Sequence, residues 1–575
     1  MENSFITHGE KQSKSDTIRL IQNGVEITDT ESIVNVFADY FGKIGDNLES
    51  NLRSTDFSPY QNIAQNPHTF ALFPVSSIEI MKIISKLKLT GTHIDVMPVK
   101  IFKSIKEFVC DVITNLINSS FFYAVFPSYL KLAKITPLYK KNDKKTCSNY
   151  RPISSLNYIS KIYERAMASR VTSFFTKFSL FSSKQFGFLK NLSTQHALHD
   201  FLENIYDALD SGKHNISVLI DLQSAFDTVN HNILLNKFEM YEIRGHPLSL
   251  FKSYLSDREF FVQIGNIKSN HHKLNIGIPQ GSILGPLLFI IYNNDLPLVS
   301  DLLSTTLFAD DTNFSLAHYD YNSMIPILNQ ELDKIHDWTI ANRLTVNVTK
   351  TELLLFTNRQ TSQNDQQVSF DNSFLNYVDK ARFLGVQVDC NLNFKPHVTH
   401  ILGKIAKHAG ILFKIRHNLT TEAKITYYNS LVLPCWNFNI LHWGGTNKTH
   451  LVPLVNIQKR IIRTIAGASF TAHTTPLFYR YKLLKLEDLY RFQAIVDTHA
   501  KILLKGEHRS LHARNTRFSN LAVPKFHRTQ RTQQSITFQG PSMWNTLPEH
   551  LQQIDSMKVF KDKLKSYFIE LYNDH

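Results

Sequence analysis

The segment Thr305–Ala317 has the sequence TTLFADDTNFSLA, in which two β-rich runs flank the adjacent aspartates Asp310 and Asp311. The runs, Thr305–Ala309 and Asn313–Ala317, are short enough to form a hairpin with the two aspartates at its turn. Carboxylates at such a tip can hold a hard cation. Adjacent aspartates are common, however, and taken alone they indicate a solvated turn.

A second acidic position strengthens the metal-site interpretation. Asp221 directly follows the apolar run Val218–Ile220, at the carboxyl end of a predicted strand, and Ala225-Phe226-Asp227 comes shortly after it. If the two strands are neighbours in one sheet, Asp221 and Asp310 come within reach of a shared metal. Two divalent ions held by carboxylates can activate a hydroxyl nucleophile and hold a leaving pyrophosphate.

Length and composition exclude several classes of protein. The chain has 575 residues, enough for several domains, and 43% hydrophobic and 19% charged residues exclude wholesale disorder. The longest apolar stretch, near Leu287–Tyr292, is far shorter than the roughly 20 residues of a membrane span. Residues 1–16 are too polar for a signal peptide. Four scattered cysteines exclude a disulfide scaffold or zinc finger and indicate a reducing, intracellular compartment.

The charge balance indicates a polyanionic partner. Lys and Arg number 63 against 49 Asp and Glu, which leaves a net charge of +14. On charge alone, a nucleic-acid partner and a generically basic protein both remain open. The basic residues cluster in the window 131–151 and again in Lys505–Arg531.

The hydrophobic pattern predicts an α+β chain with a central mixed sheet. Expected helices are Glu31–Asn51, Ser282–Asn294 and Ser323–Asn342, and residues after about 395 are expected to be helical and basic. Expected strands include a hairpin of Phe260–Gly265 with Lys273–Ile278, and the segments Thr351–Phe356 and Phe383–Val388.

Three segments carry a specific resemblance. Residues 218–230 (VLIDLQSAFDTVN), 277–289 (GIPQGSILGPLLF) and 308–312 (FADDT) resemble the successive palm motifs of reverse transcriptases, most closely those of non-LTR retrotransposons of the LINE-type, jockey-like branch. The flanking segments 126–164, 185–198, 338–356 and 383–397 follow in the same order as in that family. The resemblance implies an RNA-directed DNA polymerase that uses an RNA template, a DNA primer and dNTPs.

The resemblance also implies a metal site. Asp221, Asp310 and Asp311 match the catalytic acids of the family, and the backbone carbonyl of Leu222 would complete the shell of two Mg²⁺ ions, which Mn²⁺ can replace. Lys350, in the sequence NVTKT, matches a lysine that protonates the leaving pyrophosphate. A solvated surface lysine remains the alternative for Lys350.

Further matched positions would contact the incoming nucleotide. Phe226 takes the place of the aromatic steric gate that favours dNTPs, although a core aromatic residue is also possible there. Gln280 and Gly281 match the segment that lies against the base and template, and Arg151 with Lys140 (or Lys141) match the grip on the triphosphate. The segment 383–385 (FLG) resembles the primer grip. Leu189 departs from the family, which usually has arginine near this position.

The implied architecture is a right-hand polymerase with a basic helical extension. We expect a connector at 1–70, fingers at 71–215, a palm at 216–394, thumb-like helices at 395–470 and a basic C-terminal region at 471–575. Residues 1–70 are too short for the N-terminal endonuclease of such elements. The expected location is the cytoplasm or nucleus, without a membrane partner. A catalytically silent nucleic-acid-binding relic and an RNA-templated RNA polymerase remain as alternatives.

Overall fold

The computed structural model describes residues 18–22, 24–88, 94–95, 97–359, 367–505, 522–525, 527–529 and 531–573. These residues form sheets and many helices, and the chain divides into two compact units. Unit 1 comprises residues 1–188, 222–299 and 334–346, and unit 2 comprises 189–221, 300–333 and 347–575. The chain therefore passes between the units several times, and each unit is described by itself below.

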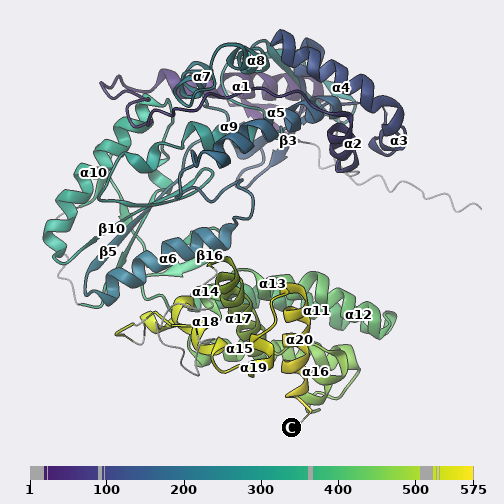
Figure 1. Ribbon diagram of the computed structural model, residues 1–575, viewed down its shortest axis with the longest axis vertical. Coiled ribbons are helices and arrows are strands. Elements are labelled where there is room, and N and C mark those ends of the chain that lie inside the picture. The colour runs from purple at the N-terminus through teal and green to yellow at the C-terminus, as the bar shows by residue number, and fades with distance from the viewer. Residues whose placement is uncertain are drawn as a thin grey trace, which may run out of the picture. The chain divides into compact units, whose positions relative to one another are not determined.

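Unit 1 combines a sheet with a set of surrounding helices (Figure 1). Its strands are β1 Leu20–Gln22, β2 Val25–Ile27, β3 Leu132–Tyr139, β4 Tyr150–Leu156, β6 Arg258–Ile264, β7 Ile267–Lys268 and β8 His272–Leu274. Its helices are α1 Thr30–Ser50, α2 Ser77–Ser85, α3 Val99–Ser104, α4 Lys106–Tyr123, α5 Tyr158–Lys177, α7 His231–Met240, α8 Gly245–Leu255 and α9 Gly285–Tyr292. The sheet has the order β4-β3-β6-β7, and β8 also pairs with β6.

Helix α1 packs on this sheet through one apolar face. Asp29 caps the helix, accepting a hydrogen bond from the Ser32 backbone N–H at 2.8 Å. Phe37 and Phe41, one turn apart on the same face, are buried in a core with residues of β3, β4 and β6. The predicted helix Glu31–Asn51 is thus confirmed, with each end one residue earlier.

Unit 2 contains a second five-stranded sheet. Its order is β14-β11-β5-β10-β9, with β5 His214–Ile220, β9 Ser304–Phe308, β10 Asp311–His318, β11 Glu352–Phe356 and β14 Asn376–Tyr377. Strand β5 is buried at all seven positions and pairs antiparallel with both β10 and β11. Its β-branched residues Ile216, Val218 and Ile220 suit a central strand covered on both faces. Helix α6 Thr194–Asp210 packs against β5, β9 and β10.

The remainder of unit 2 is largely helical, as predicted for residues after 395 (Figure 1). It contains β12 Ser369–Phe370, β13 Ser373–Phe374, β15 Lys380–Phe383, β16 Val386–Asp389, α11 Lys395–Ile415, α12 Thr421–Tyr427, α13 Leu433–Asn437, α14 Ile440–Trp443, α15 Lys448–Ala466, α16 Thr475–Tyr481, α17 Leu486–Lys505, α18 Ile536–Trp544, α19 Glu549–Gln552 and α20 Met557–Glu570. Helix α10 Tyr321–Ala341 contributes to both units. Among the described helices, none combines the length and apolar character that a bilayer crossing requires.

Two strand predictions were wrong in part. The predicted strand Lys273–Ile278 ends at Leu274, because the backbone N–H groups of Gly277 and Ile278 bond to Val229 and Phe226 instead of to a neighbouring strand. The predicted single strand Phe383–Val388 is a hairpin of β15 and β16. Most of the second basic cluster, Lys505–Arg531, lies outside the described residues, as do residues 1–16.

Candidate catalytic site

The pairing of β5 with β10 brings the predicted acids to one end of the unit 2 sheet. Thr312 pairs with Ile220, so Asp311 and Asp221, which adjoin this pair, take opposite positions where the two strands end. Ala309 adopts a left-handed conformation (φ 59°), which closes the tight turn between β9 and β10 and places Asp310 at its tip. The predicted hairpin, and its position beside the strand that precedes Asp221, are both confirmed.

The three carboxylates interact electrostatically. The pKa of Asp311 is raised to about 6, first because its carboxylate is partly withdrawn from water and then because Asp310 and Asp221 add like charge; Arg382 on β15 opposes the shift. Asp310 and Asp311 keep substantial solvent exposure. The end of the sheet therefore has a concentration of negative charge that a bound cation would offset.

Lys350 lies beside one of these acids. Its Nζ is 3.3 Å from Asp221 Oδ2, and both side chains are about half exposed, at 48% and 45%. The backbone N–H of Asn347 donates to the carbonyl oxygen of Asp221 at 2.8 Å, and a short 3₁₀ turn, Val348–Lys350, then directs the chain so that Lys350 reaches the carboxylate. An ammonium group thus adjoins the acidic cluster.

The donor set fits a hard divalent cation. Mg²⁺ prefers oxygen ligands, uses only one or two carboxylates and keeps several waters that substrate phosphates can replace. Among the described residues, no group of three or more His, Cys, Asp or Glu side chains forms a ready-made metal cage. Asp221 and the Asp310–Asp311 pair offer carboxylate oxygens of the kind that Mg²⁺ prefers.

Unit 1 joins two of the sequence motifs by backbone hydrogen bonds. The N–H of Ile278 donates to the carbonyl of Phe226 at 2.9 Å, and the N–H of Gly277 donates to the carbonyl of Val229 at 2.9 Å. Phe226 is partly buried and stacks on Phe289 of α9, with ring centroids 4.9 Å apart. The loop that carries Phe226 is therefore fixed against the segment that leads to Gln280.

The segment that contains Gln280 and Gly281 lies directly against β4. The N–H of Ser154 donates to the carbonyl of Gln280 at 2.8 Å, and Gly281 has a φ of 132° that side-chain-bearing residues rarely adopt. A Cβ atom at Gly281 would lie 2.3 Å from the Ser154 carbonyl oxygen, which explains why glycine is needed there. Arg151, earlier on β4, is exposed, and Lys140 lies just beyond β3, where its N–H bonds to the Asn149 carbonyl.

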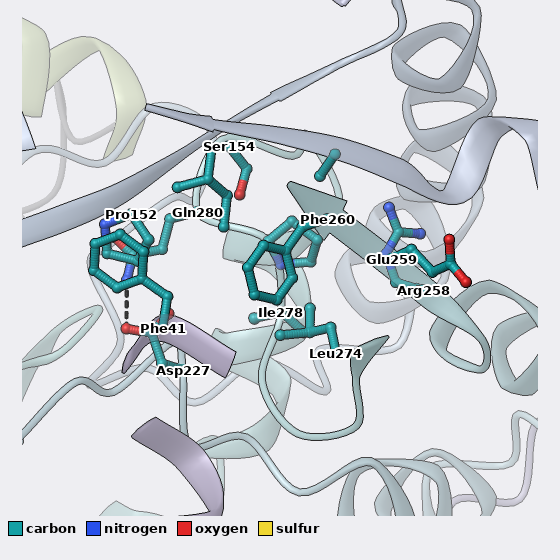
Figure 2. A pocket seen from close by; sticks show the side chains of 13 residues that line it. Phe41, Pro152, Ser154, Asp227, Arg258, Glu259, Phe260, Leu274, Ile278 and Gln280 are labelled. Carbon is teal, nitrogen blue, oxygen red and sulfur yellow. Dashed lines mark hydrogen bonds between the residues drawn. The ribbon is translucent and has the colours of Figure 1, made fainter. Parts of the chain in front are cut away.

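Figure 2 shows the pocket beneath this junction, where the amide of Gln280 donates to Asp227 Oδ2 at 2.7 Å. Burial raises the pKa of Asp227 to about 7, and the Gln280 bond opposes this. Phe41 of α1 lies beside the pair, and Phe260 lines the other side of the pocket (Figure 2). The cavity is about 30 Å³, which is room for a water molecule and not for a nucleotide.

The candidate residues therefore fall into two groups. Asp221, Asp310, Asp311 and Lys350 come together in unit 2. The nucleotide-contact candidates Phe226, Gln280, Gly281, Arg151 and Lys140 all belong to unit 1, as does Leu222, which follows Asp221 in the chain.

Two residues that interact with the candidate site residues were not predicted from the sequence. Asp227 had no predicted role, although it stands in the Ala225-Phe226-Asp227 motif; a carboxyl so close to a strand-end acid was the available signal. Arg382, which lowers the pKa of Asp311, gave no signal, because only folding brings β15 near β10. In the segment 383–385, Phe383 ends β15, and Leu384 and Gly385, both at positive φ, form the turn to β16.

Comparison with known proteins finds matches to reverse transcriptases. Residues 139–388 match the family model described as "Reverse transcriptase (RNA-dependent DNA polymerase)". The chain is 30% identical over 387 residues to the probable RNA-directed DNA polymerase from transposon X-element of Drosophila melanogaster, covering 65% of this chain and 42% of the relative. It is 26% identical over 468 residues to the RNA-directed DNA polymerase from mobile element jockey of the same species, covering 77% of this chain and 50% of the relative.

These matches identify the class of protein. Residues 139–388, which include both motif groups, form a reverse transcriptase domain. This domain is similar to the RNA-directed DNA polymerases of the transposon X-element and of the mobile element jockey. The chain spans half or less of the length of these curated relatives.

Proposed function

We propose that the chain is an RNA-directed DNA polymerase of a non-LTR retrotransposon, which adds dNTPs to a DNA 3′-OH on an RNA template. The observation that carries the proposal is the register of β5 and β10, which sets Asp221 opposite Asp311 at the end of one sheet. The family match of residues 139–388 supports the same activity.

In this proposal Asp221, Asp310, Asp311 and the Leu222 carbonyl would hold two Mg²⁺ ions, for which Mn²⁺ can substitute. Bound there, the ions would supply Lewis-acid activation of the primer hydroxyl and charge neutralisation of the leaving pyrophosphate. Lys350 would donate a proton to the pyrophosphate, since its ammonium group already adjoins the acids. The carboxylates contribute by position and charge and form no covalent intermediate with the substrate.

The unit 1 candidates would orient the nucleotide. Arg151 and Lys140 would contact the triphosphate, for which a forked guanidinium and a point charge are suited. Phe226 would crowd a 2′-hydroxyl, and its stacking on Phe289 supports a fixed ring position. Gln280 and Gly281 would lie against the base and template, and their bonds to Asp227 and Ser154 support a rigid segment.

The architecture proposed for this activity is a right hand, with fingers at 71–215, palm at 216–394, thumb-like helices at 395–470, a connector at 1–70 and a basic region at 471–575. The partners proposed are an RNA template and a DNA primer, and the place of action is the cytoplasm or nucleus. The mixed sheets, the helical region after residue 395 and the net charge of +14 are consistent with this architecture.

Primer extension tests the proposal. Purified protein with Mg²⁺, an RNA template, a DNA primer and dNTPs should extend the primer, and the double variant Asp310→Ala/Asp311→Ala should not. Equal extension by the double variant would dismiss the acid centre. Salt-sensitive RNA binding without any extension by the unmodified chain would favour the catalytically silent relic, and a preference for rNTPs would favour an RNA polymerase.

A further inference from the structure

A cavity in the helical part of unit 2 is lined by segments that carry none of the candidate acids. It is a cavity of about 390 Å³ formed where α11, α12 and α15 meet, together with the segment that follows α15. Its lining includes four cationic side chains and two aromatic rings: Arg416, Lys424, Arg460, Arg463, Phe413 and Phe470. This volume lies in the range of small-ligand sites.

The charge of the cavity is unbalanced. No Asp or Glu lines it, and within the residues that the structure describes none of its four cations forms an ion pair with a carboxylate. Four like charges around one cavity repel each other, so an anion that enters it gains attraction from all of them at once. The cavity therefore favours a polyanion.

The aromatic rings are unusually exposed for phenylalanine. Phe470 is 78% exposed and Phe413 is 43% exposed. The guanidinium of Arg416 lies 3.7 Å from the ring centroid of Phe413, and that of Arg463 lies 5.9 Å from the centroid of Phe470. Planar cations next to exposed rings provide surfaces on which a base can stack.

Local bonds hold two of the arginines in position. Arg463 Nε donates to the Ala472 carbonyl at 2.9 Å, and an Arg416 Nη donates to the Phe413 carbonyl. A guanidinium has five N–H donors, so each arginine retains donors for a ligand after making this bond. The site is thus partly organised before any ligand binds.

We infer that this cavity binds a single-stranded polynucleotide, with phosphates on Arg460 and Arg463 and a base stacked on Phe470. Positively charged grooves lined with exposed aromatic rings are how proteins bind single strands without base-pair recognition. A duplex hides its base faces and could not use the rings, and a flat membrane surface could not follow cations that line a concavity. The inference adds a second nucleic-acid contact to the proposed polymerase and does not depend on its chemistry.

The test is binding of a fluorescent, unstructured 20-nucleotide RNA, and of the DNA of the same sequence, to the full chain. Arg460→Gln/Arg463→Gln should weaken binding by about tenfold or more at near-physiological salt, and should reduce the slope of log affinity against log salt by about 1.4, since each phosphate contact to a single strand contributes about 0.7. The matched control is Lys448→Gln/Lys459→Gln, which removes the same charge from exposed positions of the same helix, α15, outside the cavity. This control should stay within about twofold of the unmodified chain.

Phe470→Leu separates stacking from charge. It should weaken binding about fivefold while leaving the salt slope unchanged, because stacking releases no counterions. Phe470 is exposed, so Phe470→Leu should leave the fold intact, and it remains informative if Arg463→Gln disturbs the bond to Ala472. Equal affinity for RNA and DNA would show that the site makes no contact with the 2′-hydroxyl. A preference for RNA would show that it does.

Three results would overturn the inference. Equal losses in the Arg460/Arg463 pair and in the Lys448/Lys459 pair would show attraction by net charge alone. Unchanged polynucleotide binding, with lost binding to vesicles containing phosphatidylserine, would assign the cavity to a lipid surface. Unchanged binding in Phe470→Leu would exclude stacking. Loss of primer extension in Asp310→Ala/Asp311→Ala with intact RNA binding would leave the cavity inference standing, so the two proposals fail separately.

Discussion

The ammonium group of Lys350 lies 3.3 Å from the carboxylate of Asp221, although 128 residues separate them in the chain. The contact follows from the backbone bond between Asn347 and Asp221, which fixes where the 3₁₀ turn begins. Because both side chains are half exposed, the ion pair contributes little to stability, on the order of 0–1 kcal/mol. Replacing Lys350 should therefore leave the stability of the fold almost unchanged.

Substitution of Lys350 tests a role in proton transfer. Lys350→Ala should reduce the rate of primer extension by about 10²-fold, the contribution of a general acid, with little change in thermal stability. Lys350→Arg keeps the charge but cannot give up its proton, so it should be nearly as slow as the alanine variant. Single-turnover extension measures both. Full activity in Lys350→Arg would assign Lys350 to charge balance only.

Gly281 should be intolerant of a side chain. In Gly281→Ala the new Cβ would meet the Ser154 carbonyl oxygen at 2.3 Å, and the φ of 132° adds strain. We therefore expect the free energy of unfolding to fall by about 2–5 kcal/mol. We also expect the affinity for the nucleotide to fall. Gly265→Ala is the matched control, since it also has positive φ but meets no atom within 4 Å. Thermal unfolding and the KM for dNTPs compare the two. Equal behaviour would refute the close approach.

Asp227 should make stability depend on pH. Its pKa in the fold, about 7, lies above its ordinary value of 3.8, so the folded chain retains a proton that the unfolded chain releases. Stability should therefore fall as the pH rises from about 4 to 7, by at most about 4 kcal/mol at 1.36 kcal/mol per pKa unit.

Asp227→Asn removes this titration and retains an acceptor for Gln280. The melting temperature of Asp227→Asn, relative to the unmodified chain, should thus rise between pH 4 and 7 and level off above. A difference that stays constant over this range would contradict the assignment.

Phe226 should govern the choice between dNTP and rNTP. Phe226→Val removes most of the ring while keeping an apolar contact with Phe289, and should raise incorporation of rNTPs relative to dNTPs by about tenfold or more. Phe289→Leu removes the stacking partner but keeps the Phe226 ring, so it should change the ratio much less than Phe226→Val does. A parallel change in both variants would make Phe226 a packing residue only.

Long, patterned elements could be predicted from the sequence, and contacts between distant segments could not. The helical spacing of apolar residues was sufficient for α1, and the turn chemistry around Asp310 was sufficient for β9 and β10. The segment 275–278 looked like a strand because Ile276 and Ile278 alternate, but its N–H groups bond to the loop after Asp221, a tertiary contact that periodicity does not encode.

The acidic residues of the candidate site could be predicted from the sequence, and the neighbouring residues that interact with the site residues could not. Asp221, Asp310 and Asp311 could be named because acids at strand ends have a recognisable pattern. The contributions of Asp227 and Arg382 depend on burial and proximity, which arise only in the folded chain.

The most direct test of the account is single-turnover extension of a DNA primer on an RNA template by Asp221→Asn. Asp301→Asn, an exposed acid in the loop before β9, is the matched control. We predict that Asp221→Asn reduces the rate by at least about 10²–10³-fold while still binding primer–template, as expected when preorganised charge at the reacting centre is lost. Asp301→Asn should match the unmodified chain. Extension by Asp221→Asn at the rate of the control would contradict the central claim that the strand-end carboxylates form the catalytic centre.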